Sequence, residues 1–280
     1  MSNRPRARPA TAAGTWLNTS MTTVFATAAT PLSRRIDMNI LVVNDDGYQA
    51  KGLELLVKAL NPFGTVYISA PLHHQSAKSH AITIRNKIET FPGEPLYGSS
   101  GTLVVDGTPA DAVRLGLKCF NIDFDLVVSG INYGQNIAKD ILYSGTVAAA
   151  VEAKVLGIDA IAISAPHPNL PYLYDETIKL FDEIIEAKLY EGPGILNINF
   201  PKETFTRPKG VRITKMGLRN QHAEYVKSEK PDIYFIKSSV IEYQEDEQSD
   251  VTAYNEGYVS ITPLTLDRSD HAWIKKILKP

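Results

Sequence analysis

The chain alternates between short apolar runs and longer segments in which apolar residues recur every three or four positions. Short runs predict buried strands, and the longer period predicts amphipathic helices. Up to residue 187 we expect strands at 39–43, 65–70, 103–106, 125–129 and 160–164, and helices at 50–60, 109–117, 146–156 and 172–187. This alternation predicts an α/β fold, namely a three-layer, Rossmann-like, mostly parallel sheet with helices on both faces.

The pattern changes in the last third of the chain. Four further apolar runs predict strands without helices between them, at 195–200, 211–216, 234–243 and 258–261. Strands in such succession pair as hairpins. We therefore expect a core at about 38–200 and a hairpin-rich extension at about 201–280. The acidic stretch 242–250 predicts a solvated loop or hairpin tip.

Residues 1–37 show no apolar periodicity. They are rich in Ala, Thr, Arg and Pro, and Asp37 is their only acidic residue. This composition predicts disorder or a non-native leader, with Met38 as the working first residue. A transit peptide is the alternative, because such peptides are also rich in Arg and poor in acids. The folded domain is expected at 38–280.

Composition narrows the class of protein. With 280 residues, 44% hydrophobic and 21% charged, the chain can bury a large core, and its net charge of -2 argues against a nucleic-acid polymer as partner. The sequence contains no run that predicts a membrane span, so we expect a soluble, cytoplasmic protein. The single cysteine, Cys119, cannot form an internal disulfide and is expected to be a buried structural thiol.

The segment Asn44-Asp45-Asp46-Gly47 follows the first predicted strand directly. Open α/β sheets bind ligands at the carboxyl ends of their strands. Two adjacent carboxylates repel each other unless a cation lies between them or one stays protonated, which favours a divalent metal. The same residues are also good turn formers, so the turn interpretation remains open.

Two more loops follow predicted strands and should converge on the same edge. One contains Ser76, and the other, 129–136, contains Asn132 and Asn136. Their oxygen atoms, with the two carboxylates, suit Mg²⁺ or Mn²⁺ better than zinc. Each loop alone is weak evidence, because a lone serine is usually a cap or turn residue and Asn-rich runs are usually plain loops.

A fourth segment, Ser144-Gly145-Thr146, precedes the Ala-rich helix predicted at 146–156. A helix N-terminus presents free amides and a favourable dipole to a phosphate. A simple N-cap made by Ser144 or Thr146 is compatible with the same sequence.

Together these motifs resemble the SurE family, the survival-protein 5′/3′-nucleotidases. The matching segments, in order, are 40–47 (ILVVNDDG), 69–71 with 75–76, 80–83 (HAIT), 107–111 (GTPAD), 129–136 (SGINYGQN), 143–152 (YSGTVAAAVE) and 257–264 (GYVSITPL). Two positions depart from the family pattern. Leu72 stands where the family usually has an acidic residue, and Ser79 stands where glycine is common.

The resemblance implies a phosphomonoesterase that hydrolyses nucleoside 5′-monophosphates, with 3′-monophosphates and short polyphosphate as further candidate substrates. It implies one Mg²⁺ or Mn²⁺ per subunit and a homodimer or homotetramer with exchanged C-terminal extensions. The implied metal ligands are Asp45, Asp46, Ser76 and Asn132; the implied phosphate-binding residues are Asn136, Ser144, Gly145 and Thr146; and Asp45, Asp46, Asn136 and Ser144 form the implied catalytic set.

Some mechanistic alternatives stay open. Direct attack by water is favoured over a covalent aspartyl-phosphate, because the comparable aspartyl phosphatases use an Asp-x-Asp spacing, whereas the two aspartates of this chain are adjacent. His73, His74 and His80 lie close together in the sequence. They are expected to face solvent or cap the loop rather than act as general acid. A nucleotide- or metal-binding protein without turnover is the alternative function, because fold does not establish catalysis.

Overall fold

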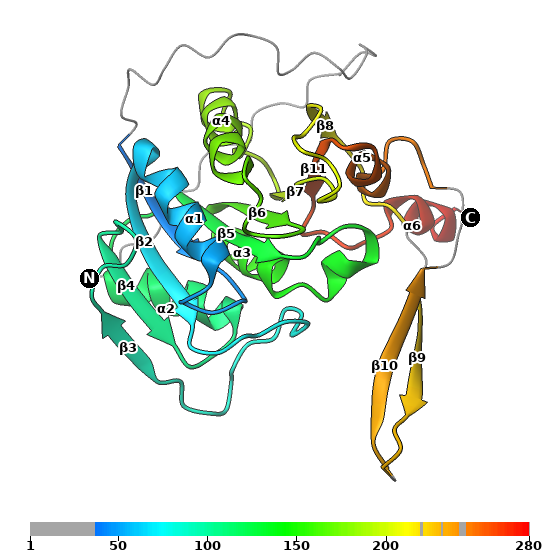
Figure 1. Ribbon diagram of the computed structural model, residues 1–280, viewed down its shortest axis with the longest axis horizontal. Coiled ribbons are helices and arrows are strands. Elements are labelled where there is room, and N and C mark those ends of the chain that lie inside the picture. The colour runs from blue at the N-terminus through cyan, green and yellow to red at the C-terminus, as the bar shows by residue number, and fades with distance from the viewer. Residues whose placement is uncertain (1–36, 219–220, 231, 241–244, 280) are drawn as a thin grey trace.

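The computed structural model describes residues 37–218, 221–230, 232–240 and 245–279, so the predicted leader lies almost wholly outside the described residues. Within them, nine strands form one sheet in the order β3-β4-β2-β1-β5-β6-β7-β11-β8, and β9 and β10 form a separate hairpin (Figure 1). Six adjacent strands, from β4 to β7, run parallel. The predicted mostly parallel α/β fold is confirmed.

The element bounds follow the apolar pattern closely in the first 200 residues. The strands are β1 Met38–Val43, β2 Gly64–Pro71, β3 Thr90–Gly93, β4 Gly101–Val105, β5 Leu126–Tyr133, β6 Asp159–Ala165 and β7 Ile195–Asn199. The helices are α1 Lys51–Leu60, η1 Asn61–Phe63, α2 Pro109–Phe120, η2 Ala138–Leu142, α3 Gly145–Val155 and α4 Leu173–Glu186. The edge strand β3 was not predicted.

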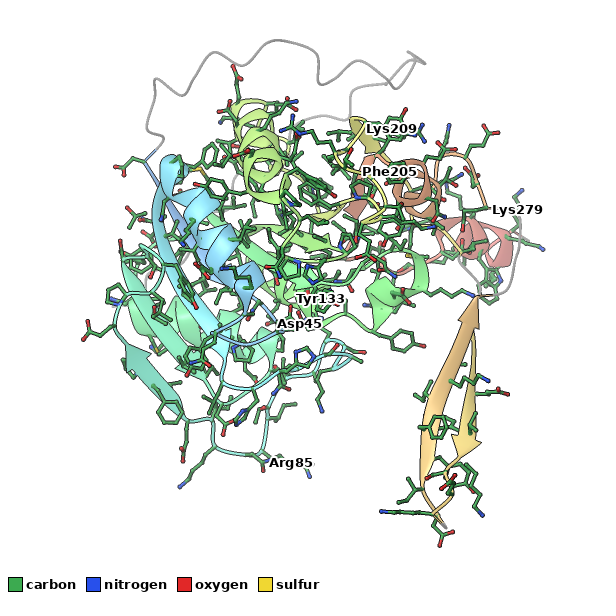
Figure 2. All side chains as sticks on the ribbon, in the orientation of Figure 1. Asp45, Arg85, Tyr133, Phe205, Lys209 and Lys279 are labelled. Carbon is green, nitrogen blue, oxygen red and sulfur yellow. The ribbon has the colours of Figure 1, made fainter. Side chains whose placement is uncertain are left out.

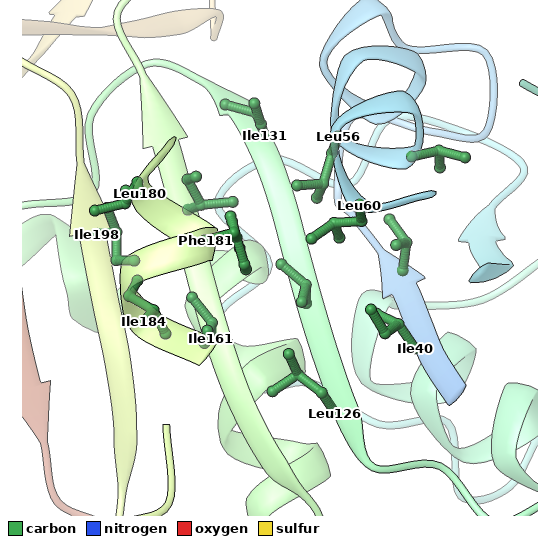
Figure 3. Close-up of a cluster of buried hydrophobic side chains, with 14 of the residues drawn as sticks. Ile40, Leu56, Leu60, Leu126, Ile131, Ile161, Leu180, Phe181, Ile184 and Ile198 are labelled. Carbon is green, nitrogen blue, oxygen red and sulfur yellow. The ribbon is translucent and has the colours of Figure 1, made fainter. Parts of the chain in front are cut away.

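Two hydrophobic clusters, one on each face, hold the sheet between its helices. In β1, Ile40 and Val42 belong to the cluster that includes α1 and α4, whereas Leu41 and Val43 belong to the cluster that includes α2 and α3. Figure 3 shows the first cluster, in which Phe181 of α4 packs among side chains from the strands and α1. Because β1 is buried on both faces, its sequence is continuously apolar rather than alternating.

The C-terminal part contains more helix than the sequence predicted. It contains β8 Val211–Ile213, β9 Gln221–Lys227, β10 Tyr234–Val240, α5 Asp250–Glu256, β11 Val259–Leu264 and α6 His271–Ile277. The expectation of strands without intervening helices was therefore wrong. The helix α5 begins at a cap made by Ser249, whose side chain accepts from Thr252 N, and ends at Gly257, which has a left-handed conformation. Serine and glycine are the residues that typically start and end a helix in this way, so both signals were present in the sequence.

Strand pairing in this part also differs from a simple series of hairpins. β11 pairs antiparallel with the distant β7 and parallel with β8, and only β9 and β10 pair as neighbours along the chain. The acidic stretch predicted to be solvated ends in Asp250, which is fully buried. Its carboxylate accepts hydrogen bonds from Ala138 N (3.0 Å) and Gly217 N (2.9 Å), and burial raises its pKa.

The β9–β10 hairpin projects away from the body of the protein (Figure 1). Large apolar side chains on it are exposed, including Tyr225, Phe235 and Ile236. Trp273 and Ile277 of α6 are also exposed. In the described part of the chain, no helix has the length and apolar character needed to cross a bilayer.

Cys119 is exposed, so the prediction of a buried structural thiol was wrong. The buried residues of α2 end at Gly116. Cys119 lies on the exposed side of the last turn, whereas Leu117 and Phe120 of the same turn pack against the core.

Candidate functional site

The loop after β1 is a tight turn closed by a buried asparagine. The Asn44 side chain donates to Gly47 O (2.8 Å) and accepts from Gly47 N (3.3 Å). Gly47 has φ +101°, which favours glycine. The turn predicted for these four residues is present, and its geometry leaves the two intervening carboxylates, Asp45 and Asp46, at the carboxyl edge of the sheet. The turn and the candidate metal site are therefore compatible.

Asp45 is almost completely buried and lies against the start of α3. Thr146 Oγ1 donates to Asp45 Oδ1 at 2.5 Å. A Cβ on Gly145 would lie 2.9 Å from Asp45 Cβ, so only glycine allows this close approach. Burial raises the pKa of Asp45 to about 6, the neighbouring Asp46 charge adds to this, and the Thr146 hydrogen bond opposes it.

Asp46 is half-buried and faces two groups that the sequence did not assign to it. Tyr133 N donates to Asp46 Oδ2 (3.0 Å), and His74 Nδ1 lies 3.3 Å from Asp46 Oδ1. Burial raises the Asp46 pKa, and the Tyr133 hydrogen bond and the His74 charge oppose the rise. The structure thus brings the first and third predicted loops together through Asp46.

The third loop carries Asn132 and Asn136, and they differ in how they are held. Asn132 Nδ2 donates to Gly134 O (2.8 Å), which leaves its carbonyl oxygen available as a ligand. Asn136 is buried: its backbone N donates to Asn199 Oδ1 (2.7 Å), and its side-chain Nδ2 donates to Ser164 Oγ (2.9 Å). One of the two side-chain N–H groups of Asn136 is therefore already used inside the protein.

The second loop reaches the site beside Ser76. Gln75 N donates to Asp45 O (2.7 Å), and Ser79 N donates to Tyr143 O (3.0 Å), so the segment between them is tied at both ends. Ser76 is exposed and its hydroxyl makes no hydrogen bond with any described residue. Ser79 has φ +51°, a left-handed conformation that favours glycine. This agrees with the glycine that is common here in the family that the sequence resembles.

The start of α3 combines a helix cap with free backbone amides. Ser144 Oγ accepts from Val147 N (3.0 Å), so the predicted N-cap is present. The hydroxyl of Thr146 is committed to Asp45 rather than to a ligand. The backbone N–H groups of Gly145 and Thr146, in the first turn of the helix, remain the groups that would meet a phosphate.

The donor set fits a hard divalent cation. The Thr146 hydroxyl engages Oδ1 of Asp45, and this carboxylate, with Asp46, Asn132 and Ser76, supplies only oxygen atoms. The described residues contain no group of three or more His, Cys, Asp and Glu side chains that could hold a metal ion by themselves. Two carboxylates with neutral oxygens suit Mg²⁺ or Mn²⁺, which keep waters and bind together with phosphates, better than zinc.

An ion cluster around the buried Glu152 lies beside the site and was missed from the sequence. Glu152, two turns along α3, is 3% exposed; its Oε2 lies 2.6 Å from His80 Nε2, and its Oε1 lies 2.6 Å from Arg114 Nη2. The expectation that His80 faces solvent or caps the loop was therefore wrong. It ties the loop that carries Ser76 to α3. No local signal joins these residues, because they are far apart in the sequence.

Figure 2 shows Asp45 and Tyr133 at the same edge of the sheet. Known proteins share the segments that meet at this edge. A family model described as "Survival protein SurE" matches residues 40–223. The chain belongs to the SurE family. The match includes Asp45, Asp46, Ser76, Asn132 and the start of α3, which are the segments that converge at this edge.

Individual SurE relatives extend the match over most of the chain. A protein of Mannheimia succiniciproducens named "5′-nucleotidase SurE" is 38% identical over 84% of this chain and 95% of its own length. One of the same name from Petrotoga mobilis is 36% identical over 86% of this chain and 98% of its own. The crystal structure of a SurE protein from Aquifex aeolicus has a TM-score of 0.71 at 35% identity and covers 85% of this chain and 98% of that one.

Proposed function

We propose that the protein is a metal-dependent phosphomonoesterase that hydrolyses nucleoside 5′-monophosphates to nucleoside and phosphate. The observation that carries the proposal is the contact between the aspartate turn and the start of α3, made by the Thr146–Asp45 hydrogen bond at 2.5 Å. It brings a buried carboxylate next to a helix N-terminus, which supports a bound cation and a bound phosphate lying side by side. The relatives named 5′-nucleotidase support the nucleotide as substrate.

The proposed residue roles follow from the atoms that remain free. Asp45, Asp46, Asn132 and Ser76 would hold one Mg²⁺ or Mn²⁺, which when bound neutralises phosphoryl charge and lowers the pKa of water. The amides of Gly145 and Thr146 would bind equatorial phosphate oxygens.

The proposed catalytic set is Asp45, Asp46, Asn136 and Ser144. The second side-chain N–H of Asn136 is free to donate to the phosphate, and Ser144 acts by fixing the start of α3 through its cap. Asp46 or Asp45 would orient the attacking water, or take its proton, for in-line displacement.

We propose further that residues 38–280 form the catalytic unit, that it works in the cytoplasm, and that it is a homodimer or homotetramer with exchanged C-terminal extensions. The exposed apolar side chains of the β9–β10 hairpin and α6 support an oligomer, because large uncovered apolar patches mark interaction surfaces. 3′-Monophosphates and short polyphosphate remain candidate substrates.

The test is release of inorganic phosphate from nucleoside 5′- and 3′-monophosphates, ribose 5-phosphate and short polyphosphate, each with Mg²⁺, with Mn²⁺ and with EDTA. We expect metal-dependent release, fastest from 5′-monophosphates. Binding of nucleotide without any release would instead favour a non-catalytic nucleotide-binding protein. Trapping of a phosphorylated aspartate after rapid quenching would replace direct attack by water with a covalent mechanism.

A further inference from the structure

Tyr133 is an exposed aromatic residue next to the candidate site in the sequence. It follows Asn132, and its backbone N donates to Asp46 Oδ2 at 3.0 Å, while its side chain is 62% exposed. Figure 2 shows Tyr133 at the same edge of the sheet as Asp45. The backbone of this residue thus belongs to the cation site, and its ring extends from that site into solvent.

The ring does not project alone. The centroids of Tyr133 and His167 lie 5.2 Å apart at an interplanar angle of 75°, an edge-to-face arrangement. β5 and β6 hold the two residues together, since Tyr133 pairs with Ala165 at the end of β6 and Gly134 N donates to Ala165 O at 2.8 Å.

His167 itself is in a restrained position. It lies between Pro166 and Pro168, whose rings fix their own φ angles. Its Nδ1 accepts a hydrogen bond from Asn169 N (3.1 Å), which sets the orientation of the imidazole. A ring pair held in this way loses little conformational freedom when a flat ligand packs on it.

We propose that Tyr133 and His167 form the nucleobase subsite, on which the base of the substrate stacks while its phosphate lies at Asp45, Asp46 and the start of α3. The proposal rests on the proposed phosphatase function and adds to it the feature that separates nucleotides from other phosphomonoesters. In a nucleoside monophosphate, one sugar separates the base from the phosphate. In the protein, the backbone of Tyr133 contacts Asp46 and its side chain carries the ring away from that contact. Stacking on a π face suits every base, so broad base tolerance is expected.

Tyr143 provides the matched comparison. It is also 62% exposed and also lies next to a candidate site residue, Ser144, but no aromatic ring contact joins it to a described residue. If mere exposure of an aromatic ring near the site were enough, the two tyrosines would contribute equally to nucleotide binding.

The experiment compares adenosine 5′-monophosphate with ribose 5-phosphate, which has the same sugar phosphate but no base. For Tyr133→Ala we expect KM for adenosine 5′-monophosphate to rise roughly ten- to hundredfold, the range that loss of one base stack predicts. KM for ribose 5-phosphate and kcat for both substrates should change less than about twofold, because backbone contacts to Asp46 remain. Tyr133→Trp and Tyr133→Phe should retain wild-type KM values, and His167→Ala should give a smaller change of the same kind.

Two results would overturn the proposal. One is an equal rise of KM for both substrates in Tyr133→Ala and in Tyr133→Leu, which keeps apolar bulk without a π face and guards against a folding defect. The other is a base-selective loss in Tyr143→Ala but not in Tyr133→Ala.

Calorimetric binding of the same two ligands to the full chain in EDTA separates this proposal from the phosphatase function. If wild type released no phosphate, the proposed activity would fail. The subsite would still stand if adenosine 5′-monophosphate bound more tightly than ribose 5-phosphate and Tyr133→Ala abolished the difference. Equal binding of both ligands by wild type would overturn it.

Discussion

The carboxyl edge of the sheet buries polar side chains, whereas the C-terminal extension exposes apolar ones. At the edge, the polar side chains of Asn44, Asp45 and Thr146 are less than 5% exposed and are joined to the protein by hydrogen bonds. On the extension, the apolar side chains of Tyr225 and Ile236 are more than half exposed. Buried polar groups need hydrogen-bond partners, and large exposed apolar patches usually contact another surface. The polar side chains at the edge find their partners within one chain, whereas we expect a second subunit to cover the apolar side chains of the extension.

The largest expected effect is at the edge. Asp45→Asn keeps the shape of the site but removes one of its two negative charges. Loss of several kcal/mol of transition-state stabilisation corresponds to a fall in kcat/KM of roughly 10²- to 10³-fold. The measurement is kcat/KM for a nucleoside monophosphate as a function of Mn²⁺ concentration.

Asp125→Asn is the matched control for this change. Asp125 is a carboxylate at the opposite edge of the sheet, where it accepts a hydrogen bond from Asn39 N at 2.8 Å. Its replacement should leave kcat/KM unchanged. Near-normal, metal-dependent turnover by Asp45→Asn would remove the aspartate turn from the site and with it the contrast between the two regions.

The second effect is on the extension. Tyr225 and Ile236 are direct cross-strand partners in the β9–β10 hairpin. Replacing both with Ser should lower the molar mass measured by light scattering at micromolar concentration, because it removes apolar surface that a partner would cover. The pair Glu224 and Lys237, opposite each other one position along, is the control, and changing both to Gln should leave the mass unchanged. A monomeric wild type would show that the extension is complete on its own.

The third effect is the dependence of the metal-free protein on pH. The Asp45 pKa rises from 3.8 to about 6 on folding, so the folded state holds this proton more tightly than the unfolded state. The associated stability is fully present below pH 3.8 and is lost as pH rises through 6. At about 1.4 kcal/mol per pH unit this is about 3 kcal/mol.

Denaturant unfolding in EDTA at pH 4 and pH 7 measures this loss. It should be smaller in Asp45→Asn than in wild type, since the variant has no carboxyl group to titrate there. Addition of Mn²⁺ at pH 7 should restore much of the wild-type stability, because a bound cation favours the charged form. An equal loss in both proteins would show that Asp45 does not titrate as its burial implies.

The smallest effect concerns the ion cluster that ties the loop to α3. Glu152→Gln should lower the free energy of unfolding by about 1 kcal/mol, a modest value because His80 and Arg114 are partly exposed. Amide hydrogen exchange in residues 73–85 should become faster than in wild type. Glu176→Gln, whose contact with Arg207 is long at 3.9 Å, is the control. Unchanged hydrogen exchange in the Glu152 variant would show that the ion cluster does not restrain the loop that carries Ser76.

Much of the core could be predicted because its signals are local. The helix predicted at 109–117 begins as α2 at Pro109, where Thr108 and Asp111 form a capping box. Ser144 likewise caps α3 where the sequence placed a cap. Such signals act within one helical turn, so a single sequence contains all the residues that they need.

The convergence of the loops was also predictable, because the carboxyl ends of parallel strands meet at one edge. The use of each side chain within the site was not. Thr146 was expected at the phosphate, yet its hydroxyl donates to Asp45, 101 positions earlier in the chain. His80 and Glu152 are 72 positions apart and meet only because the loop folds over α3.

The sequence by itself determined the α/β core and the helix caps, since periodicity and capping depend on near neighbours, and its motifs supplied the residues proposed for the candidate site. Tertiary structure alone decided the burial of Asp250, the exposure of Cys119 and the pairing of Tyr133 with His167. These features depend on which surfaces pack against each other. Burial and packing are properties of the whole fold, and they set the pKa of Asp45 and the hydrogen-bond partner of Thr146.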